Sequence, residues 1–247
     1  MKTISLFASL VLEFLFPEGC RICGSMLISG ESSFYGLCHS CRDGFAVETA
    51  SRCEKCGKPL ISESCFCLSC RAILETKDES KTQMSYDRLI SLFPYTGKWK
   101  KLLKAFKFGK SIPLGRFLSE RLLEALVLLK ADEGEKPVLV PVPPRPGKIR
   151  KTGWDQVESL AVLLKKNREA PPVLRCLKRL KSETQKKLNR KRRQENLRGR
   201  VFAKGNIPKI CVLFDDVITT GSTMDACAKA LKDSGAEKVY GICLFYD

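Results

Sequence analysis

Several features that define common functional classes are missing from this sequence. The 247 residues include one histidine, His39, which disfavours a reaction mechanism that depends on histidine. No uncharged run approaches the ~18 residues of a transmembrane helix. The apolar segment at residues 4–12 is followed by no small-residue cleavage site, which argues against a secretory signal peptide. The nucleotide-binding pattern G-x-x-x-x-G-K is also absent. The sequence therefore predicts a cytoplasmic protein with no membrane span.

Acidic residues are scarce relative to basic ones. The chain has 27 Asp and Glu against 44 Lys and Arg, which gives a formal net charge of +17. The excess is confined to two segments. Residues 97–116 hold seven basic residues and no acidic one, and residues 175–209 hold fourteen basic residues and two acidic ones. A localised basic surface predicts an anionic partner, which is nucleic acid, a phosphorylated small molecule or acidic lipid.

Cysteine, by contrast, is abundant. Nine of the thirteen cysteines lie within residues 20–70, and eight of these form four C-x-x-C pairs. Such a pair places two thiolates on one side of a tight turn, and two pairs together form a tetrahedral metal site. The pairs are Cys20/Cys23, Cys38/Cys41, Cys53/Cys56 and Cys67/Cys70. We therefore predict two structural zinc sites in a reducing compartment, with sequential pairing favoured over an interleaved cross-brace.

The remaining candidate ligands are expected to lie outside the zinc sites. His39 lies inside C-H-S-C and can replace a thiolate, but a bystander role is favoured, and Cys65 has no partner in a C-x-x-C pair. Four further cysteines have largely apolar neighbours and are expected in the core: Cys176, Cys211, Cys227 and Cys243. We expect residues 3–16 to form an amphipathic helix that packs on the zinc module. Structural support is the favoured role of this module, and a protein-docking surface or a weak nucleic-acid contact are the alternatives.

The pattern along the chain predicts two domains and a linker. Residues 1–75 form the zinc module, the polar residues 76–86 are the linker, and residues 87–247 form the second domain. In the second domain, strands are expected over 88–95, 138–142, 210–214 and 238–245, and helices over 98–108, 114–130, 156–166 and 223–234. Strands that alternate with helices of this length predict an α/β fold with a parallel sheet.

Residues 211–224, C-V-L-F-D-D-V-I-T-T-G-S-T-M, join an apolar strand to the start of a helix. Ligands of open α/β sheets bind beyond the carboxyl ends of strands. The loop supplies hydroxyl groups, Gly221 lets the backbone approach an anion, and a helix N-terminus favours negative charge. Asp215 and Asp216 would repel phosphate, but they suit hydroxyl groups or a divalent metal beside it. The pattern predicts a ribose-phosphate site, whereas a helix cap would explain only Ser222 and Thr223.

The segment D-D-V-I-T-T-G-S-T resembles the ribose-5-phosphate loop of type I phosphoribosyltransferases. The resemblance implies that Asp215 and Asp216 hold the ribose hydroxyls of phosphoribosyl pyrophosphate (PRPP), with Mg²⁺ bridging the pyrophosphate. It also implies that five loop residues bind the 5′-phosphate: Thr219, Thr220, Gly221, Ser222 and Thr223. The loop after residues 138–142 matches the pyrophosphate-loop position, which implies that Arg145 and Lys148 face the pyrophosphate.

The order of motifs along the chain resembles the ComF/ComFC/GntX family. The Cys pairs are followed by V-P-V-P at 140–143, G-W-D-Q at 153–156, T-Q-K-K-L-N-R-K-R-R-Q-E-N at 184–196 and the D-D-V-I-T-T-G loop. Thr152 and Asp155 replace the Arg and Asn of the family's R-G-x-N-Q. The resemblance implies a type I phosphoribosyltransferase fold with an N-terminal double zinc-ribbon module. It also implies a role in natural competence and in the uptake or processing of single-stranded DNA, with competence or recombination proteins as partners.

The two basic segments are the candidate nucleic-acid surface. A solvated face or a loop that closes over PRPP are the alternatives, but the excess charge exceeds what one PRPP requires. We predict that single-stranded nucleic acid contacts Lys101, Lys104, Lys186, Lys187, Arg190, Lys191, Arg192 and Arg193. Trp99 and Phe106 either stack on bases or pack in the core, and their helical spacing favours the core.

Three functions follow from these features. The first is a PRPP-binding and single-stranded-DNA-binding competence protein. The second is an active phosphoribosyltransferase that transfers ribose 5-phosphate to a nucleobase or amine. Its chemistry depends on positioning by Mg²⁺ and cations more than on a general base, so the scarcity of histidine does not exclude it. The third is an adaptor whose phosphate site is vestigial.

Overall fold

Four parallel strands form the centre of the molecule. The computed structural model describes residues 18–27, 30–47, 51–60, 65–75, 84–129, 136–180 and 200–247. The strands lie in the order β1-β6-β5-β2, and every neighbouring pair is parallel. Their bounds are Arg88–Pro94 (β1), Val138–Pro141 (β2), Ile210–Ile218 (β5) and Lys238–Tyr246 (β6). The predicted α/β fold with a parallel sheet is confirmed, and it is consistent with a phosphoribosyltransferase-like domain.

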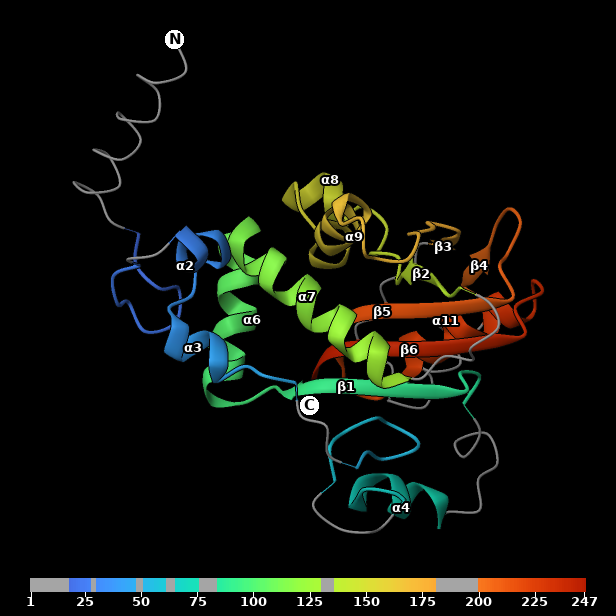
Figure 1. Cartoon of the computed structure of the whole chain (residues 1–247). Coiled ribbons are helices and arrows are strands. Elements are labelled where there is room, and N and C mark those ends of the chain that lie inside the picture. The colour runs from blue at the N-terminus through green and yellow to red at the C-terminus, as the bar shows by residue number, and fades with distance from the viewer. Residues whose placement is uncertain are drawn as a thin grey trace.

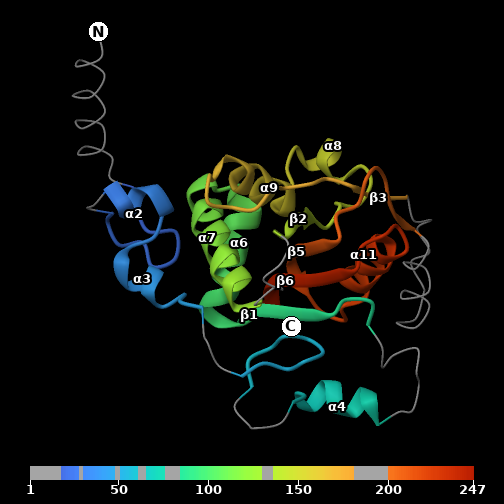
Figure 2. The same ribbon diagram turned by 45° about the vertical axis from the view of Figure 1, so that its right-hand side comes forward.

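Helices cover both faces of this sheet (Figures 1 and 2). One face carries α6 (Gly97–Gly109), α7 (Ile112–Leu129) and α9 (Gln156–Lys166). The other carries α11 (Ser222–Lys232) and the antiparallel pair β3 (Leu177–Arg179) and β4 (Val201–Ala203). Successive strand residues point to opposite faces, so Val212 and Phe214 join the first core while Cys211 and Leu213 join the second.

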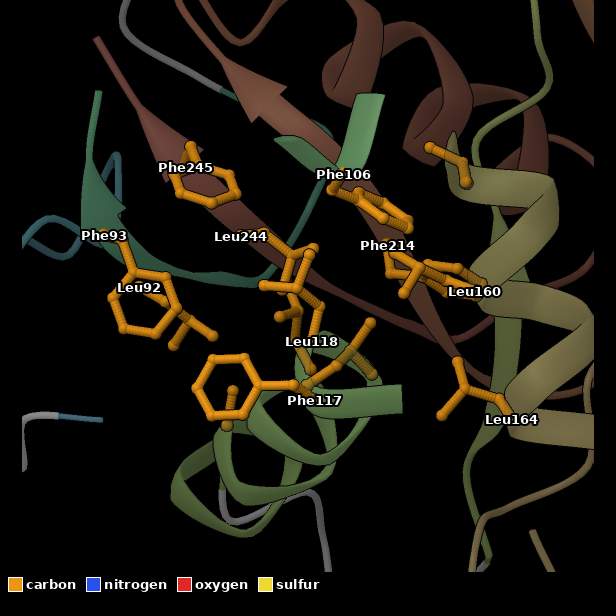
Figure 3. Packing of buried hydrophobic residues seen from close by; sticks show 14 of the residues in the cluster. Leu92, Phe93, Phe106, Phe117, Leu118, Leu160, Leu164, Phe214, Leu244 and Phe245 are labelled. Carbon is orange, nitrogen blue, oxygen red and sulfur yellow. The ribbon is translucent and has the colours of Figure 1, made fainter. Parts of the chain in front are cut away.

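The larger core is rich in aromatic side chains, which Figure 3 shows packed between the sheet and the helices. Phe93, Phe106 and Phe245 are fully buried there. Trp99 stacks on Phe93 with ring centroids 4.7 Å apart and an interplanar angle of 12°. The prediction that Trp99 and Phe106 pack in the core rather than stack on bases is therefore confirmed.

Most elements agree with the sequence prediction to within two or three residues at each end, but β5 differs. It continues to Ile218, whereas the apolar pattern predicted an end at residue 214. The cause is pairing with β6, which extends through Asp215 opposite Cys243 and Ile218 opposite Tyr246. The two acids therefore lie on a hydrogen-bonded strand. The sequence also did not predict β3, β4 or the short helix α8 (Lys148–Thr152).

The first zinc ribbon lies beside α6 and α7 (Figures 1 and 2) and contains α2 (Gly30–Tyr35) and α3 (His39–Asp43). The Tyr35 hydroxyl donates a hydrogen bond to Glu120 Oε1 of α7 at 2.6 Å. The Phe45 ring packs edge-on against Trp99, with centroids 4.7 Å apart. This ribbon is thus anchored on the helices α6 and α7 that cover the sheet.

The second zinc ribbon, which contains α4 (Leu68–Leu74), lies along β1 instead. The Ser91 amide donates to the Gly57 carbonyl at 3.1 Å, and the Ser91 hydroxyl donates to the Cys56 carbonyl at 2.8 Å. Arg52 donates from Nη1 to the Ser91 carbonyl at 2.7 Å. Because β1 is at the edge of the sheet, these bonds satisfy backbone groups that another chain would otherwise pair with.

Two of the predicted segments lie wholly or largely outside the described residues. They are the helix over 3–16 and most of the linker over 76–86. Residues 84–86 of that linker are described, and Tyr86 is buried among them. Within the described ranges, no helix has both the length and the apolar character needed to cross a membrane.

Candidate functional site

The paired cysteines gather into two clusters of four. One contains Cys20, Cys23, Cys38 and Cys41, and the other contains Cys53, Cys56, Cys67 and Cys70. Within each cluster the sulfur atoms all lie within 4.8 Å of one another. Four converging thiolates suit a tetrahedral zinc ion, so the clusters support two structural zinc sites. The structure groups the pairs sequentially rather than in a cross-brace.

The other sulfur and imidazole groups lie apart from these clusters. His39 is exposed and its Nδ1 lies 2.8 Å from Asp43 Oδ2, which is consistent with the bystander role. Cys65 is exposed. The four cysteines predicted for the core are all buried, as expected: Cys176, Cys211, Cys227 and Cys243.

The hydroxyl-rich loop connects β5 to α11, as the sequence predicted. Gly221 is the N-cap residue of α11, with φ +76°, and it has no side chain to cap the helix, while the Ser222 amide donates to Thr220 Oγ1 at 3.4 Å. Ser222 and Thr223 instead belong to the first turn, and the Ser222 hydroxyl lies 2.7 Å from that of Thr220. A cavity of about 40 Å³ is lined by residues 217–224 together with Asp215 and Cys243. The arrangement offers hydroxyl groups and the N-terminus of a helix to an anion.

The acidic pair lies beside this loop. The Asp216 amide donates to Asp215 Oδ1 at 2.8 Å. Burial raises the pKa of Asp215 well above its usual range, and the neighbouring charge of Asp216 raises it further. A carboxyl group with such a raised pKa is common where a site is completed by a cation or a hydroxyl-bearing ligand.

A larger cavity of about 510 Å³ opens next to the acids. Its charged lining consists of Lys107, Arg145, Lys148, Arg179, Asp155, Asp215 and Asp216. Four cations and three carboxylates thus surround one volume. This combination suits a ligand that carries phosphate groups together with hydroxyl groups or a metal ion.

Sequence reasoning missed Lys107 and Arg179. Lys107 lies near the end of α6, and Arg179 is the last residue of β3. Burial lowers the pKa of Arg179 and nearby Arg145 lowers it further, while Asp215 acts in the opposite direction. The only sequence signal for Arg179 was its place in the basic segment 175–209.

Lys148 lines the same cavity, but its ammonium group is bonded to two side chains at the start of α9. It lies 2.5 Å from Asp155 Oδ2 and 2.6 Å from Gln156 Oε1. Asp155 is buried, and its Oδ1 accepts a hydrogen bond from the Glu158 amide at 3.1 Å, which caps α9. The G-W-D-Q segment therefore joins α8 to the start of α9 at the rim of the cavity.

The basic residues of α6 form an exposed stripe. Lys101 and Lys104 share the solvent face with Lys107 and Phe108, because these positions are three or four residues apart. The Phe108 side chain is 73% exposed. The other six predicted contacts lie outside the described residues: Lys186, Lys187, Arg190, Lys191, Arg192 and Arg193.

Comparisons with known proteins bear on both parts of the chain. Residues 11–74 match a family described as "Double zinc ribbon domain". The chain is 28% identical to competence protein F of Haemophilus influenzae over 211 residues, which cover 83% of this chain and 87% of that protein. It is also 28% identical to competence protein ComFC of Bacillus subtilis over 203 residues, which cover 81% and 79% of the two chains.

Two further similarities differ in extent. The DNA utilization protein YhgH of Salmonella typhimurium is 25% identical over 234 residues, which cover 92% of this chain and 96% of that protein. A segment of 40 residues is 48% identical to ribose-phosphate pyrophosphokinase 1 of Listeria monocytogenes, and it covers 16% of this chain and 13% of that protein.

The fold and the clusters define the class of protein: a parallel α/β domain joined to a double zinc ribbon. Relatives named as competence proteins and as a DNA utilization protein match most of the chain, so the resemblance to the ComF/ComFC family is confirmed.

Proposed function

We propose that this chain is a cytoplasmic protein that binds PRPP with Mg²⁺ and acts on single-stranded DNA during natural competence. The observation that carries the proposal is the junction of β5 and α11. There, Asp215 and Asp216 lie between a hydroxyl-rich helix N-terminus and a cavity lined by Arg145 and Arg179. The names of the relatives, which refer to competence and DNA utilization, support the biological role.

Each part of PRPP has a counterpart in this arrangement. The 5′-phosphate would bind residues 219–223, where hydroxyl groups and the first turn of α11 favour an anion. Asp215 and Asp216 would hold the ribose hydroxyls. The pyrophosphate would extend toward Arg145 and Arg179, and carboxylate oxygens suit the Mg²⁺ that accompanies it.

The stripe on α6 supports the nucleic-acid half of the proposal. Cations that follow a phosphate backbone, interleaved with an exposed aromatic ring, are typical of single-strand binding. Lys101, Lys104 and Phe108 provide these groups, and Lys107 of the same stripe lines the large cavity. We assign the basic residues of 184–198 to the same partner. Competence or recombination proteins would act beside this chain.

The apolar part of the large cavity favours a second candidate, an active phosphoribosyltransferase. Val142, Pro143 and Val157 line the cavity beside the acids, and such a wall suits a nucleobase or amine acceptor. The acceptor nitrogen would form a bond to ribose C1 as the bond from C1 to the pyrophosphate oxygen breaks. Pyrophosphate would then leave with its charge held by Mg²⁺ and the arginines, and it would take up the proton that the acceptor nitrogen loses.

Calorimetry of the zinc-loaded full chain with PRPP and Mg²⁺ tests the small-molecule site. Wild type should bind, and Gly221→Val should not, because a β-branched residue is strained at φ +76° and would distort the phosphate loop. Gly235→Val is the matched control, because it introduces the same side chain at another glycine with a positive φ. Gly235 follows the other end of α11 with φ +109°, and no atom of the described residues lies within 4 Å of a Cβ built there. Retained binding by Gly221→Val would place the phosphate elsewhere.

Fluorescence anisotropy with a labelled single-stranded oligonucleotide tests the nucleic-acid surface. Affinity should fall as salt is added. In a plot of the logarithm of the binding constant against the logarithm of the salt concentration, each phosphate contacted should contribute about −0.7 to the slope. Loss of the Phe108 ring should weaken binding by about 1–3 kcal/mol. Val127→Ala, which removes another exposed apolar side chain, should leave binding unchanged. PRPP turnover on a nucleobase without DNA binding would favour the transferase, and binding of neither ligand would favour the adaptor.

A further inference from the structure

The second zinc ribbon and the phosphate loop share a cavity that the proposed function leaves unused. It measures about 170 Å³. Lys55 and three cysteines of the second zinc cluster (Cys56, Cys67 and Cys70) form one wall, while Thr220 and Gly221 belong to the opposite wall. Met84 and Tyr86 also line the cavity. The metal-binding part of the chain therefore adjoins the loop that we assign to the 5′-phosphate.

Tyr86 contacts both walls of this cavity. Its side chain is 7% exposed. The hydroxyl donates a hydrogen bond of 2.9 Å to the carbonyl oxygen of Lys55, which lies in the turn between Cys53 and Cys56. On the other side, a Cβ built on Gly221 would lie 3.6 Å from the same hydroxyl. A single buried group thus packs against the phosphate loop and bonds to the zinc ribbon.

The turn of the zinc ribbon is held through three consecutive carbonyl groups. Lys55 accepts from Tyr86, Cys56 accepts from the Ser91 hydroxyl, and Gly57 accepts from the Ser91 amide. A metal ion that binds the thiolates on either side fixes such a turn, because metal binding and folding of these modules are coupled. Zinc in this cluster would therefore fix the position of the acceptor that holds Tyr86.

The residue before Tyr86 extends the connection to α11. The Ser85 amide donates to Asp225 Oδ1 at 2.7 Å, and the Asp225 amide donates to the Gly221 carbonyl at 2.8 Å. Asp225 is 4% exposed. Residues 85 and 86 consequently join the start of α11, where the phosphate would bind, to the turn of the second ribbon.

We infer that Tyr86 is a positioning residue that couples zinc in the second cluster to phosphate binding in the loop at residues 219–223. The inference rests on the proposed function, because it takes PRPP as the ligand of that loop. Coupling of this kind is reciprocal, so PRPP should also slow the loss of zinc from the second cluster. The first ribbon contacts α6 and α7, and its zinc should show no such coupling.

Tyr86→Phe tests the inference, since it removes the hydroxyl and keeps the buried ring. Tyr35→Phe is the matched control, because Tyr35 makes the corresponding hydroxyl bond of the first ribbon, to Glu120 at 2.6 Å. Calorimetry with PRPP and Mg²⁺ should give about fivefold weaker binding for Tyr86→Phe, the effect of one lost hydrogen bond. Tyr35→Phe should bind PRPP as wild type does.

Zinc release to a chromogenic chelator provides a second measurement that does not depend on activity. PRPP should slow the release of one of the two zinc ions in wild type and in Tyr35→Phe. The protection should be lost or strongly reduced in Tyr86→Phe, while zinc content before the challenge stays the same. A residue that merely stabilised the fold would alter release from both clusters and would not alter the effect of PRPP.

The outcomes separate the inference from the proposed function. If wild type binds no PRPP, the proposed function fails and the inference fails with it. If wild type binds PRPP but Tyr86→Phe binds equally well and keeps the protection, the inference alone is overturned. Equal loss of affinity in Tyr35→Phe would also overturn it, because the effect would then be general.

Discussion

The docking of the second ribbon on β1 can be tested with a pair of matched glycines. Gly57 follows Cys56 and Gly24 follows Cys23, at the same place in the two C-x-x-C-G turns. Their φ angles are +68° and +80°, so alanine is strained at either position. At Gly57 a Cβ would lie 2.2 Å from the Leu89 carbonyl oxygen and 2.7 Å from Ile90 Cα. At Gly24 no described atom lies within 4 Å.

The difference between these surroundings sets the expected magnitude. The left-handed conformation costs about 1–2 kcal/mol for a residue with a Cβ, in both variants. Overpacking adds about 1–3 kcal/mol, and only for Gly57→Ala. β1 cannot withdraw easily, because Leu89 is paired with Gly241 of β6. We therefore expect Gly57→Ala to lose about 2 kcal/mol more than Gly24→Ala, or about 4–8 °C in Tm for a chain of this size.

Differential scanning fluorimetry of the two zinc-loaded variants measures this difference directly. Zinc content should remain two per chain in both, since neither glycine is a ligand and each cluster keeps its four thiolates. Equal Tm values for Gly24→Ala and Gly57→Ala would refute the reasoning, because the contact with the Leu89 backbone would then contribute nothing to stability.

Two further predictions concern thiol reactivity and pH. Iodoacetamide should modify Cys65 in the zinc-loaded chain, and the eight clustered cysteines should become reactive only after a chelator removes the zinc. Mass spectrometry identifies the modified cysteines. Modification of a clustered cysteine before the chelator is added would contradict the zinc assignment. Cys211 should stay unmodified, because burial raises its pKa to about 12. Burial also raises the pKa of Asp215, so the folded state holds this proton more tightly and stability should fall as pH rises above the usual aspartate pKa of about 4. In the ligand-free protein, Asp215→Asn should make the Tm depend less on pH. The same variant should bind PRPP with Mg²⁺ more weakly. An unchanged dependence of Tm on pH would show that burial of Asp215 does not cause the fall in stability.

The parts of this molecule that the sequence predicted well depend on local patterns. The apolar spacing of Leu102, Leu103 and Phe106 predicted α6, and the same three side chains are buried. The C-x-x-C spacing predicted two metal clusters because the thiolates of a pair converge within one turn. The order of strand, acids, hydroxyl groups and helix likewise predicted the junction of β5 and α11.

The parts that it did not predict depend on contacts between distant segments. Arg179 and Lys107 meet at one cavity although 72 positions separate them in the sequence. The extension of β5 to Ile218 follows from pairing with β6, which no local pattern of β5 reveals. Asp155 looked like a departure from R-G-x-N-Q, and the structure shows that it caps α9 and contacts Lys148.

The second ribbon shows most clearly why local sequence patterns do not predict contacts between distant segments. Its turn meets the rest of the chain through the carbonyl groups of Lys55, Cys56 and Gly57, which any residue types in those positions would supply. Gly57 carries a steric constraint, because its missing Cβ admits the backbone of β1, and the Arg52 side chain adds a bond to the Ser91 carbonyl beside the turn. Apart from Arg52 and Gly57, the bonds of the turn to β1 and Tyr86 require no particular residue type, so no local sequence pattern predicts where this ribbon packs. The coupling that we propose would require a rigid turn, and four thiolates around one metal ion would hold the turn in this way.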